Sequence, residues 1–158
     1  MVEGAPDILL ALERGFGATV RQSSWAYPAA NVLHIIGLTV LAGSVAVMDA
    51  RLLGLGSGTP WPAVVRPARR VAVAALCLML ASGSLLFAAE ASHLALNPVF
   101  QAKMALLLFA VGNAGFAGTV LRGLPPDAGM PAALRASACL SGVIWIAIAG
   151  LGRTIAYF

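Results

Sequence analysis

Four long apolar runs constrain this chain more than any other feature of its sequence. Each is close to the roughly 20 residues that a helix needs to cross the hydrocarbon core of a bilayer. We expect these spans at about residues 27–48, 71–91, 98–121 and 132–151. Of the 158 residues, 60% are hydrophobic and 10% are charged, so lipid is the expected solvent for most of the chain. The sequence predicts an all-α, four-helix transmembrane bundle in a single domain, residues 1–158.

The segments around the spans suggest how the helices begin. Asn97 and Pro98 suit the N-cap and the first position of the third span. The Gly- and Pro-rich run before residue 71 is typical of a loop. A short amphipathic helix is expected over about residues 7–20, and it would lie in the membrane interface. Its apolar face consists of Ile8, Leu9, Leu12 and Phe16.

Positive charge is unevenly distributed between the loops. The first and third loops share one side of a four-span bundle, and they hold Arg51, Arg66, Arg69, Arg70, Arg122 and Arg135. Acidic residues balance the fewer basic residues of the other side. By the positive-inside rule, we place both termini outside, in the periplasm of a bacterial inner (cytoplasmic) membrane. Because the basic residues form no continuous stripe, nucleic-acid binding is not expected.

Small residues recur along the spans, where they would let helix backbones approach closely in lipid. The glycines among them are Gly37, Gly43, Gly83, Gly112, Gly115, Gly118 and Gly142. Glycine could alternatively open a slot for a flat cofactor. Cys77 and Cys139 lie within apolar runs and in no zinc or redox spacing, so we expect inert thiols, with a disulfide between them as the alternative.

His34 is the most informative polar residue, because ionisable side chains within spans are costly and usually functional. It lies about 10 Å along the first span, at 1.5 Å per residue. His93, the other histidine, comes at the end of the second span and emerges on the same outer side. Two imidazoles facing each other across a bundle can ligate a haem iron. We therefore predict a haem site with His34 and His93 as axial ligands.

Charged residues near the same outer side could complete this site. Lys103, Arg153 and Arg21 are candidates to pair with the haem propionates. Glu90 could orient an imidazole by accepting its second N–H. A simpler alternative exists for both kinds of residue. The histidines could be hydrogen-bonded or solvated, and the long basic side chains could extend to the lipid headgroups.

Motifs of other chemistries are missing from the sequence. There is no Walker loop, no GxGxxG, no HExxH and no GxSxG. Hydrolytic and nucleotide chemistry are therefore not expected. The five methionines form no MxxM or MxM pair, which makes copper the weaker metal hypothesis.

Several motifs resemble those of a bacterial family of four-helix membrane proteins that is known as a domain of unknown function. They are VRQSSWAYPAANVLHIIGL, MDARLLGLG, LLFAAEASHLALNPVFQAKMALL and AGLGRTIAYF, and they cover nearly the whole chain. More distantly, the histidine of LHIIGLTVLAG and the lysine of FQAKMALLL resemble the pattern of HemJ-type protoporphyrinogen oxidases and CopD-type membrane domains.

The resemblance to the HemJ-type proteins, which bind haem b, implies that His34 is a haem ligand and Lys103 a site residue. This chain departs from their pattern on the third span, where Asn113, Phe116 and Ala117 stand in place of a further histidine. The resemblance therefore implies a shared haem-binding architecture more than a shared enzymatic activity.

The leading expectation is a haem b-binding protein with a redox or electron-transfer role in the periplasmic half of the membrane. It would be a membrane oxidoreductase or a cytochrome b-like carrier, with a quinone or a periplasmic electron carrier as its partner. The first alternative is a cofactor-free accessory subunit, packed in a homo-oligomer or a larger membrane complex. The second is CopD-like metal handling or transport.

Overall fold

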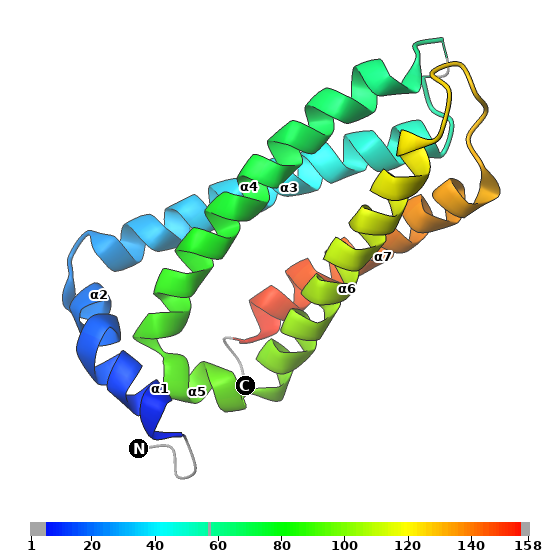
Figure 1. Cartoon of the computed structure of the whole chain (residues 1–158). Coiled ribbons are helices and arrows are strands. Elements are labelled where there is room, and N and C mark those ends of the chain that lie inside the picture. Colours follow the sequence, from blue (N-terminus) through cyan, green and yellow to red (C-terminus); the bar gives the residue numbers. More distant parts are fainter. Residues whose placement is uncertain (1–5, 57, 156–158) are drawn as a thin grey trace.

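Four long helices dominate the structure, a computed structural model that describes residues 6–56 and 58–155. They are α3 (Ala26–Leu52), α4 (Trp61–Ala89), α6 (Pro98–Arg122) and α7 (Ala132–Thr154). All four are long and apolar enough to cross a membrane, and the described residues include no strand. The predicted all-α bundle of four membrane-spanning helices is confirmed (Figure 1).

Helix α4 begins ten residues before the predicted start of the second span, so the expected loop before residue 71 was partly wrong. Pro62 lies in the first helical turn, where its missing N–H has no helical partner to lose, whereas Pro67 lies inside the helix. The indole of Trp61 is buried and donates from Nε1 to the carbonyl of Pro125 at 3.0 Å. This bond ties the start of α4 to the loop before α7, a contact that local composition does not reveal.

The predicted start of the third span is confirmed. Asn97 Oδ1 accepts hydrogen bonds from the backbone N–H of Val99 at 2.8 Å and of Phe100 at 3.2 Å. Pro98 occupies the first helical position of α6. Between α4 and this cap lies one short helix, α5 (Ala91–Leu96), so the chain reverses direction within a few residues.

The long helices come together at the end of the bundle that carries the α3–α4 and α6–α7 loops, here called the loop end. A buried cluster joins them there, made of Leu52, Trp61, Val65, Leu121, Leu134 and Ala138. Arg69 of α4 lies directly against Gly118 of α6, so a side chain at position 118 would collide with the guanidinium. The loops that we predict to face the cytoplasm therefore lie at the closed end of the bundle.

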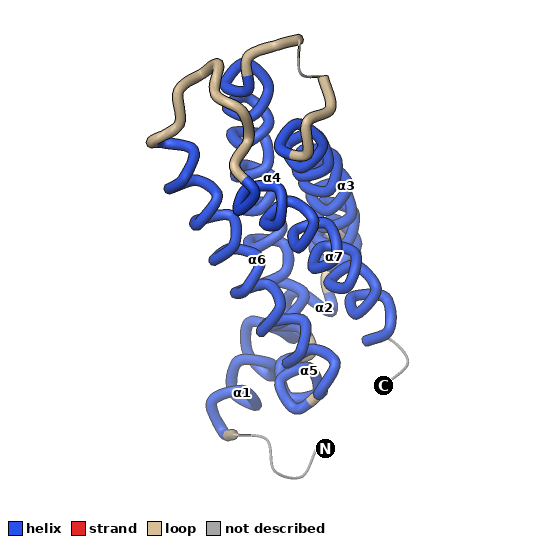
Figure 2. Tube along the Cα trace, turned by 90° about the vertical axis from the view of Figure 1, so that its right-hand side faces the viewer, coloured by secondary structure: helices blue, strands red, loops and turns tan. Residues whose placement is uncertain are grey.

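Toward the opposite end, here called the termini end, the helices separate into two pairs. Helix α3 packs along α4, and α6 packs along α7, while α3 also contacts α7. In the described part of the chain, α4 and α6 share no extended interface (Figures 1 and 2). Trp145 of α7 contacts the buried cluster of each pair and links the pairs near the middle.

The segment before α3 is helical, as predicted. It consists of α1 (Asp7–Leu12), a π-helical turn (Glu13–Gly17) and α2 (Ala18–Gln22). The segment packs against the end of α4 and against α5 at the termini end (Figure 1). Ile8 and Phe16 stay 77% and 55% exposed, which leaves an apolar edge suited to the membrane interface.

Close packing at glycine is confirmed at only some of the predicted positions. A Cβ at Gly37 would come 2.8 Å from the side chain of Met79, and one at Gly83 would come 3.2 Å from the ring of His34. Gly118 is close-packed as well, against Arg69, whereas the other four glycines, Gly43, Gly112, Gly115 and Gly142, have open space where a Cβ would lie. These four therefore do not mediate helix packing within the described chain.

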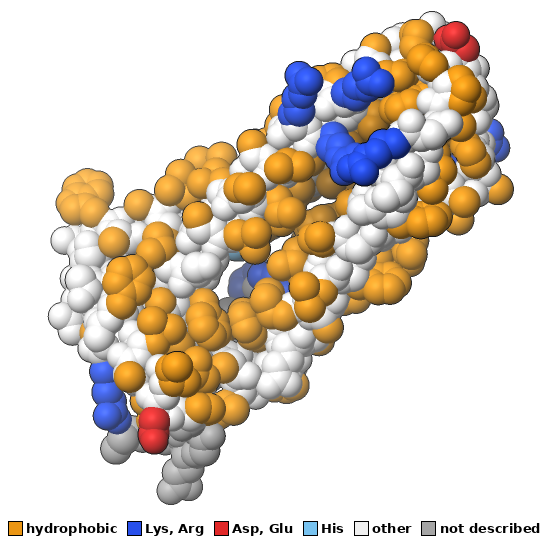
Figure 3. Space-filling view, viewed as in Figure 1, with side chains coloured by type: hydrophobic (Ala, Val, Ile, Leu, Met, Phe, Trp, Pro, Cys, Tyr) orange, Lys and Arg blue, Asp and Glu red, His pale blue; other side chains and the backbone are white. Residues whose placement is uncertain are grey.

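The outer surface of the long helices is predominantly apolar, as Figure 3 shows for one face. Leu108, Val143 and Ile146 are 75%, 67% and 76% exposed, as expected of side chains that face acyl chains. Cys77 and Cys139 are exposed and unbonded, so the two thiols form no disulfide in this structure.

Candidate functional site

A hollow lies between α4 and α6, where the two helix pairs separate. The space-filling view shows it as an opening in an otherwise filled face, with basic side-chain atoms visible in its depth (Figure 3). At the termini end, the hollow is bounded by the stacked rings of Phe87 and Phe100, whose centroids are 5.5 Å apart. At the loop end, it is bounded by the contact of Arg69 with Gly118.

His34 of α3 is half-buried and points toward α4. Its Nδ1 lies 3.0 Å from the Oγ of Ser82, which is a buried residue. The hydroxyl of Ser82 donates to the Leu78 carbonyl at 2.8 Å, so its oxygen is left to accept the proton of Nδ1.

This acceptor assigns the proton of the neutral imidazole to Nδ1. The other ring nitrogen, Nε2, then carries the free lone pair. A histidine that ligates a metal through one nitrogen commonly donates from the other to a fixed acceptor, which holds the ring in place. The absence of a Cβ at Gly83 leaves the space that the imidazole occupies against α4. His34 is thus held as a ligand would be held.

Lys103 of α6 reaches the same region from the other helix pair. Its Nζ would lie 3.4 Å from a Cβ at Gly152 of α7, so a glycine there gives the ammonium room. The charge of Lys103 acts electrostatically on His34, which places the two groups within range of each other. Lys103 is half-buried and makes no ion pair with an acidic residue in the described part of the chain.

The four long helices therefore each contribute to one site. His34 comes from α3, Ser82 and Gly83 from α4, Lys103 from α6 and Gly152 from α7. The site offers a nitrogen lone pair and an ammonium group. That pairing suits a ligand with both an electron-pair acceptor and an anionic group.

His93 does not lie beside His34 in this structure. It is exposed on the short helix α5, beyond the end of α4, and α5 lies at the termini end in Figure 1. The ring of His34 contacts Ser82 and Gly83, and Ala89, the last residue of α4, lies seven residues beyond Ser82, about 10 Å along the helix axis.

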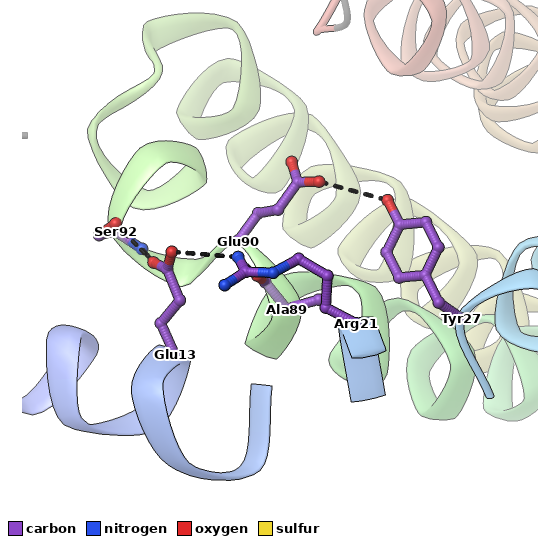
Figure 4. A network of polar contacts seen from close by, with 6 residues as sticks. All are labelled: Glu13, Arg21, Tyr27, Ala89, Glu90 and Ser92. Atoms are coloured by element: carbon purple, nitrogen blue, oxygen red, sulfur yellow. Dashed lines mark hydrogen bonds and ion pairs between the residues drawn. The ribbon is translucent and has the colours of Figure 1, made fainter. Parts of the chain in front are cut away.

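Arg21 and Glu90 take part in a polar network that holds the N-terminal segment in place (Figure 4). Arg21 donates to the carbonyl of Ala89 at 2.8 Å and pairs with Glu13 at 3.4 Å. Glu90 accepts a hydrogen bond from the hydroxyl of Tyr27 at 3.3 Å. The structure thus gives both residues structural partners and brings neither imidazole to Glu90.

Arg153 is exposed in the last turn of α7, next to Gly152, which faces Lys103. Arg153 therefore lies at the termini end of the bundle, as the sequence predicted. Residues 6–56 and 58–155 contain no group of three or more His, Cys, Asp or Glu side chains that could hold a metal ion.

Sequence reasoning did not single out Ser82 for this site. A serine within an apolar run is common, because its hydroxyl can bond the carbonyl four residues earlier. Only the fold shows that Ser82 stands opposite His34. A second polar contact of this kind links α6 and α7, where Asn113 donates to the Ser137 carbonyl at 3.0 Å and accepts from its hydroxyl at 2.9 Å.

Fold and site together define a four-span membrane protein with a histidine and a lysine between its helices. The chain belongs to a family of unknown function, DUF6644, whose family model matches residues 17–158. The predicted membership of an uncharacterised family is confirmed, while no similarity to HemJ-type or CopD-type proteins is shown. No curated protein and no solved structure matches the chain.

Proposed function

We propose that this protein binds haem b in the hollow between the helix pairs and works in redox chemistry or electron transfer. His34 is the axial ligand in this proposal, through Nε2, and Lys103 holds a propionate. The observation that carries the proposal is the bond from His34 Nδ1 to Ser82, because it leaves the Nε2 lone pair available. Arg153, also at the termini end, is a second candidate for a propionate.

The residues around the hollow fit such a group. An ammonium that lacks an acidic partner among the described residues suits a carboxylate. Apolar and aromatic surface for the haem ring comes from Phe87, Phe100 and Trp145. Bound there, haem would supply reversible one-electron chemistry. The protein would fix the imidazole through Ser82, compensate the propionate charge through Lys103 and limit the access of water.

The proposal includes the setting of the protein. The four apolar helices support a multi-pass membrane location. Arginines gather at the loop end, which favours a bacterial inner membrane with both termini in the periplasm. The site would then lie in the periplasmic half of the membrane, where a quinone or a periplasmic electron carrier could exchange electrons with it.

An absorption spectrum of the protein purified after expression with ample haem supply tests the proposal. We expect a sharp Soret band that is lost in His34→Ala. Lys103→Ala should retain part of the band but release haem faster, because it removes the charge partner and keeps the ligand. A colourless wild-type protein would overturn the proposal.

A variant at His93 decides the second axial ligand. If His93→Ala leaves a low-spin spectrum unchanged, His34 is the only histidine ligand in the protomer. Loss of the low-spin spectrum would show that His93 is the second axial ligand. Copper analysis of the same preparations tests metal handling in the CopD manner.

A cofactor-free accessory subunit is the second candidate, and the outer face of α6 favours it. A shallow apolar groove runs along this helix, lined by Ala105, Leu108, Phe109, Gly112, Asn113 and Phe116. Another membrane helix could pack there, since small residues permit close approach in lipid. Co-purification of a second subunit with a colourless protein would favour this candidate.

A further inference from the structure

Two contacts between α4 and α6 are equally spaced along both helices. On α4, Phe87 lies 18 residues after Arg69, and on α6, Gly118 lies 18 residues after Phe100. Eighteen residues make five helical turns, so the two contacts on each helix lie on one face, about 27 Å apart. The two antiparallel helices therefore face each other along this whole length, in a single register.

Between the two contacts the helices do not pack together. The register pairs Leu80 of α4 with Leu107 of α6, near the middle of the facing surfaces. Leu80 is 52% exposed, although a neighbouring helix lies on that side. Between these two contacts an apolar slot opens to the surface that faces lipid (Figure 3).

The slot leads to the site described above. Leu107 packs against the α6–α7 cluster that Trp145 also contacts, so Trp145 lies behind the slot. In the same register, Gly83, which contacts His34, stands opposite Met104, the neighbour of Lys103. By contrast, α5 and the N-terminal segment cover the termini end of α4 (Figure 1).

We infer that this slot is a lateral entrance through which haem, an amphipathic tetrapyrrole with carboxylate groups, reaches the site from the outer leaflet. The inference rests on the proposed function. An apolar ring partitions into lipid and passes between apolar helices without the desolvation that a water-filled route would require. Its carboxylates would meet Lys103, which lacks an acidic partner among the described residues.

A chemical bridge across the slot tests this entrance in the full-length protein. Leu80→Cys and Leu107→Cys are introduced together in a Cys77→Ser/Cys139→Ser background, reconstituted in lipid vesicles and joined with a short bis-maleimide. The matched control is the same variant capped with N-ethylmaleimide, which carries the same substitutions without the bridge. Mass spectrometry verifies both products.

We expect the capped apoprotein to take up hemin from the vesicles and to develop the Soret band. The bridged apoprotein should take it up at least tenfold more slowly, whereas bridging after loading should leave the haem bound. Equal loading rates in the bridged and capped proteins would overturn the lateral entrance, even if haem binding itself is confirmed.

A second measurement is independent of haem. In the same variants carrying Trp25→Phe, phospholipids with brominated acyl chains should quench the fluorescence of Trp145 when the slot is open. The bridge should reduce this quenching, with Trp61 as a constant background at the loop end. Equal quenching in bridged and capped proteins would show that no slot opens to lipid. Reduced quenching without any hemin binding would retain the slot and reject the proposed function.

Discussion

The carboxylate of Glu13 accepts hydrogen bonds from both the backbone N–H and the hydroxyl of Ser92, with the N–H bond at 2.9 Å. The two residues are 79 positions apart in the chain. Ser92 is in the first turn of α5, where backbone N–H groups lack helical partners and favour a negative charge. This contact fastens the N-terminal segment to the reversal between α4 and α6.

Replacement of Glu13 by Gln should weaken this attachment. Hydrogen bonds to charged groups contribute about 1.5–3 kcal/mol, and the amide keeps only part of that. We expect faster amide hydrogen exchange in residues 7–22 of Glu13→Gln, with little change in the long helices. Unchanged exchange would show that the contact does not hold the segment.

The same contact should respond to pH. The two hydrogen bonds from Ser92, with a smaller contribution from Arg21, hold the pKa of Glu13 below its usual value of 4.5. The folded form therefore binds the proton more weakly than the unfolded form. The stabilisation is fully present above about pH 4.5 and is lost as the pH falls through the lower folded pKa. Limited proteolysis of the segment between pH 7 and 3 should show this step in the wild type and not in Glu13→Gln.

Gly17 provides a steric test of the same attachment. A Cβ at this position would overlap the carbonyl of Ala88, because the π-helical turn lies directly on the end of α4. Gly17→Ala should destabilise the docked segment by about 1–3 kcal/mol. Gly15→Ala, two residues away with no atom near its Cβ, should be neutral or stabilising by up to about 1 kcal/mol. Similar effects of the two substitutions would contradict this close approach.

Ser82 should act on the site through His34. Ser82→Ala removes the acceptor for Nδ1–H and frees the imidazole to change tautomer or rotate. We expect a shifted or broadened Soret band and a haem affinity reduced about 10- to 100-fold, as for other partners of metal-bound histidines. Ser84→Ala is the matched control, because that hydroxyl bonds only the Leu80 carbonyl on the exposed side of α4. An identical spectrum in both variants would remove Ser82 from the site.

The cap of α6 can be tested by its effect on stability. Asn97→Ala removes both side-chain hydrogen bonds to the first turn and should cost about 1 kcal/mol, seen as a lower melting temperature in detergent. Asn97→Ser keeps an oxygen acceptor and should recover most of the loss. Equal melting temperatures for the wild type and Asn97→Ala would show that the cap is not important for stability.

Local sequence rules predicted the parts of the fold that depend on neighbouring residues. The cap at Asn97 followed from the identity of two adjacent residues, Asn97 and Pro98. The start of α4 did not follow in this way, because Trp61 is fixed by a hydrogen bond to Pro125, 64 residues away. His34 and Lys103 were predicted as site residues, whereas Ser82 was not, since its partner comes from another helix.

The sequence by itself determined that this chain forms four apolar helices, because the length and hydropathy of a span set its free energy in lipid. It also determined that most arginines lie in or near the α3–α4 and α6–α7 loops, at one end of the bundle. Only the tertiary structure decided that His34 meets Ser82 and lies near Lys103, that His93 is exposed on the short helix α5, and that α4 and α6 stay apart. Those outcomes depend on how helix faces pack, and helix packing in lipid follows shape and small residues more than hydropathy.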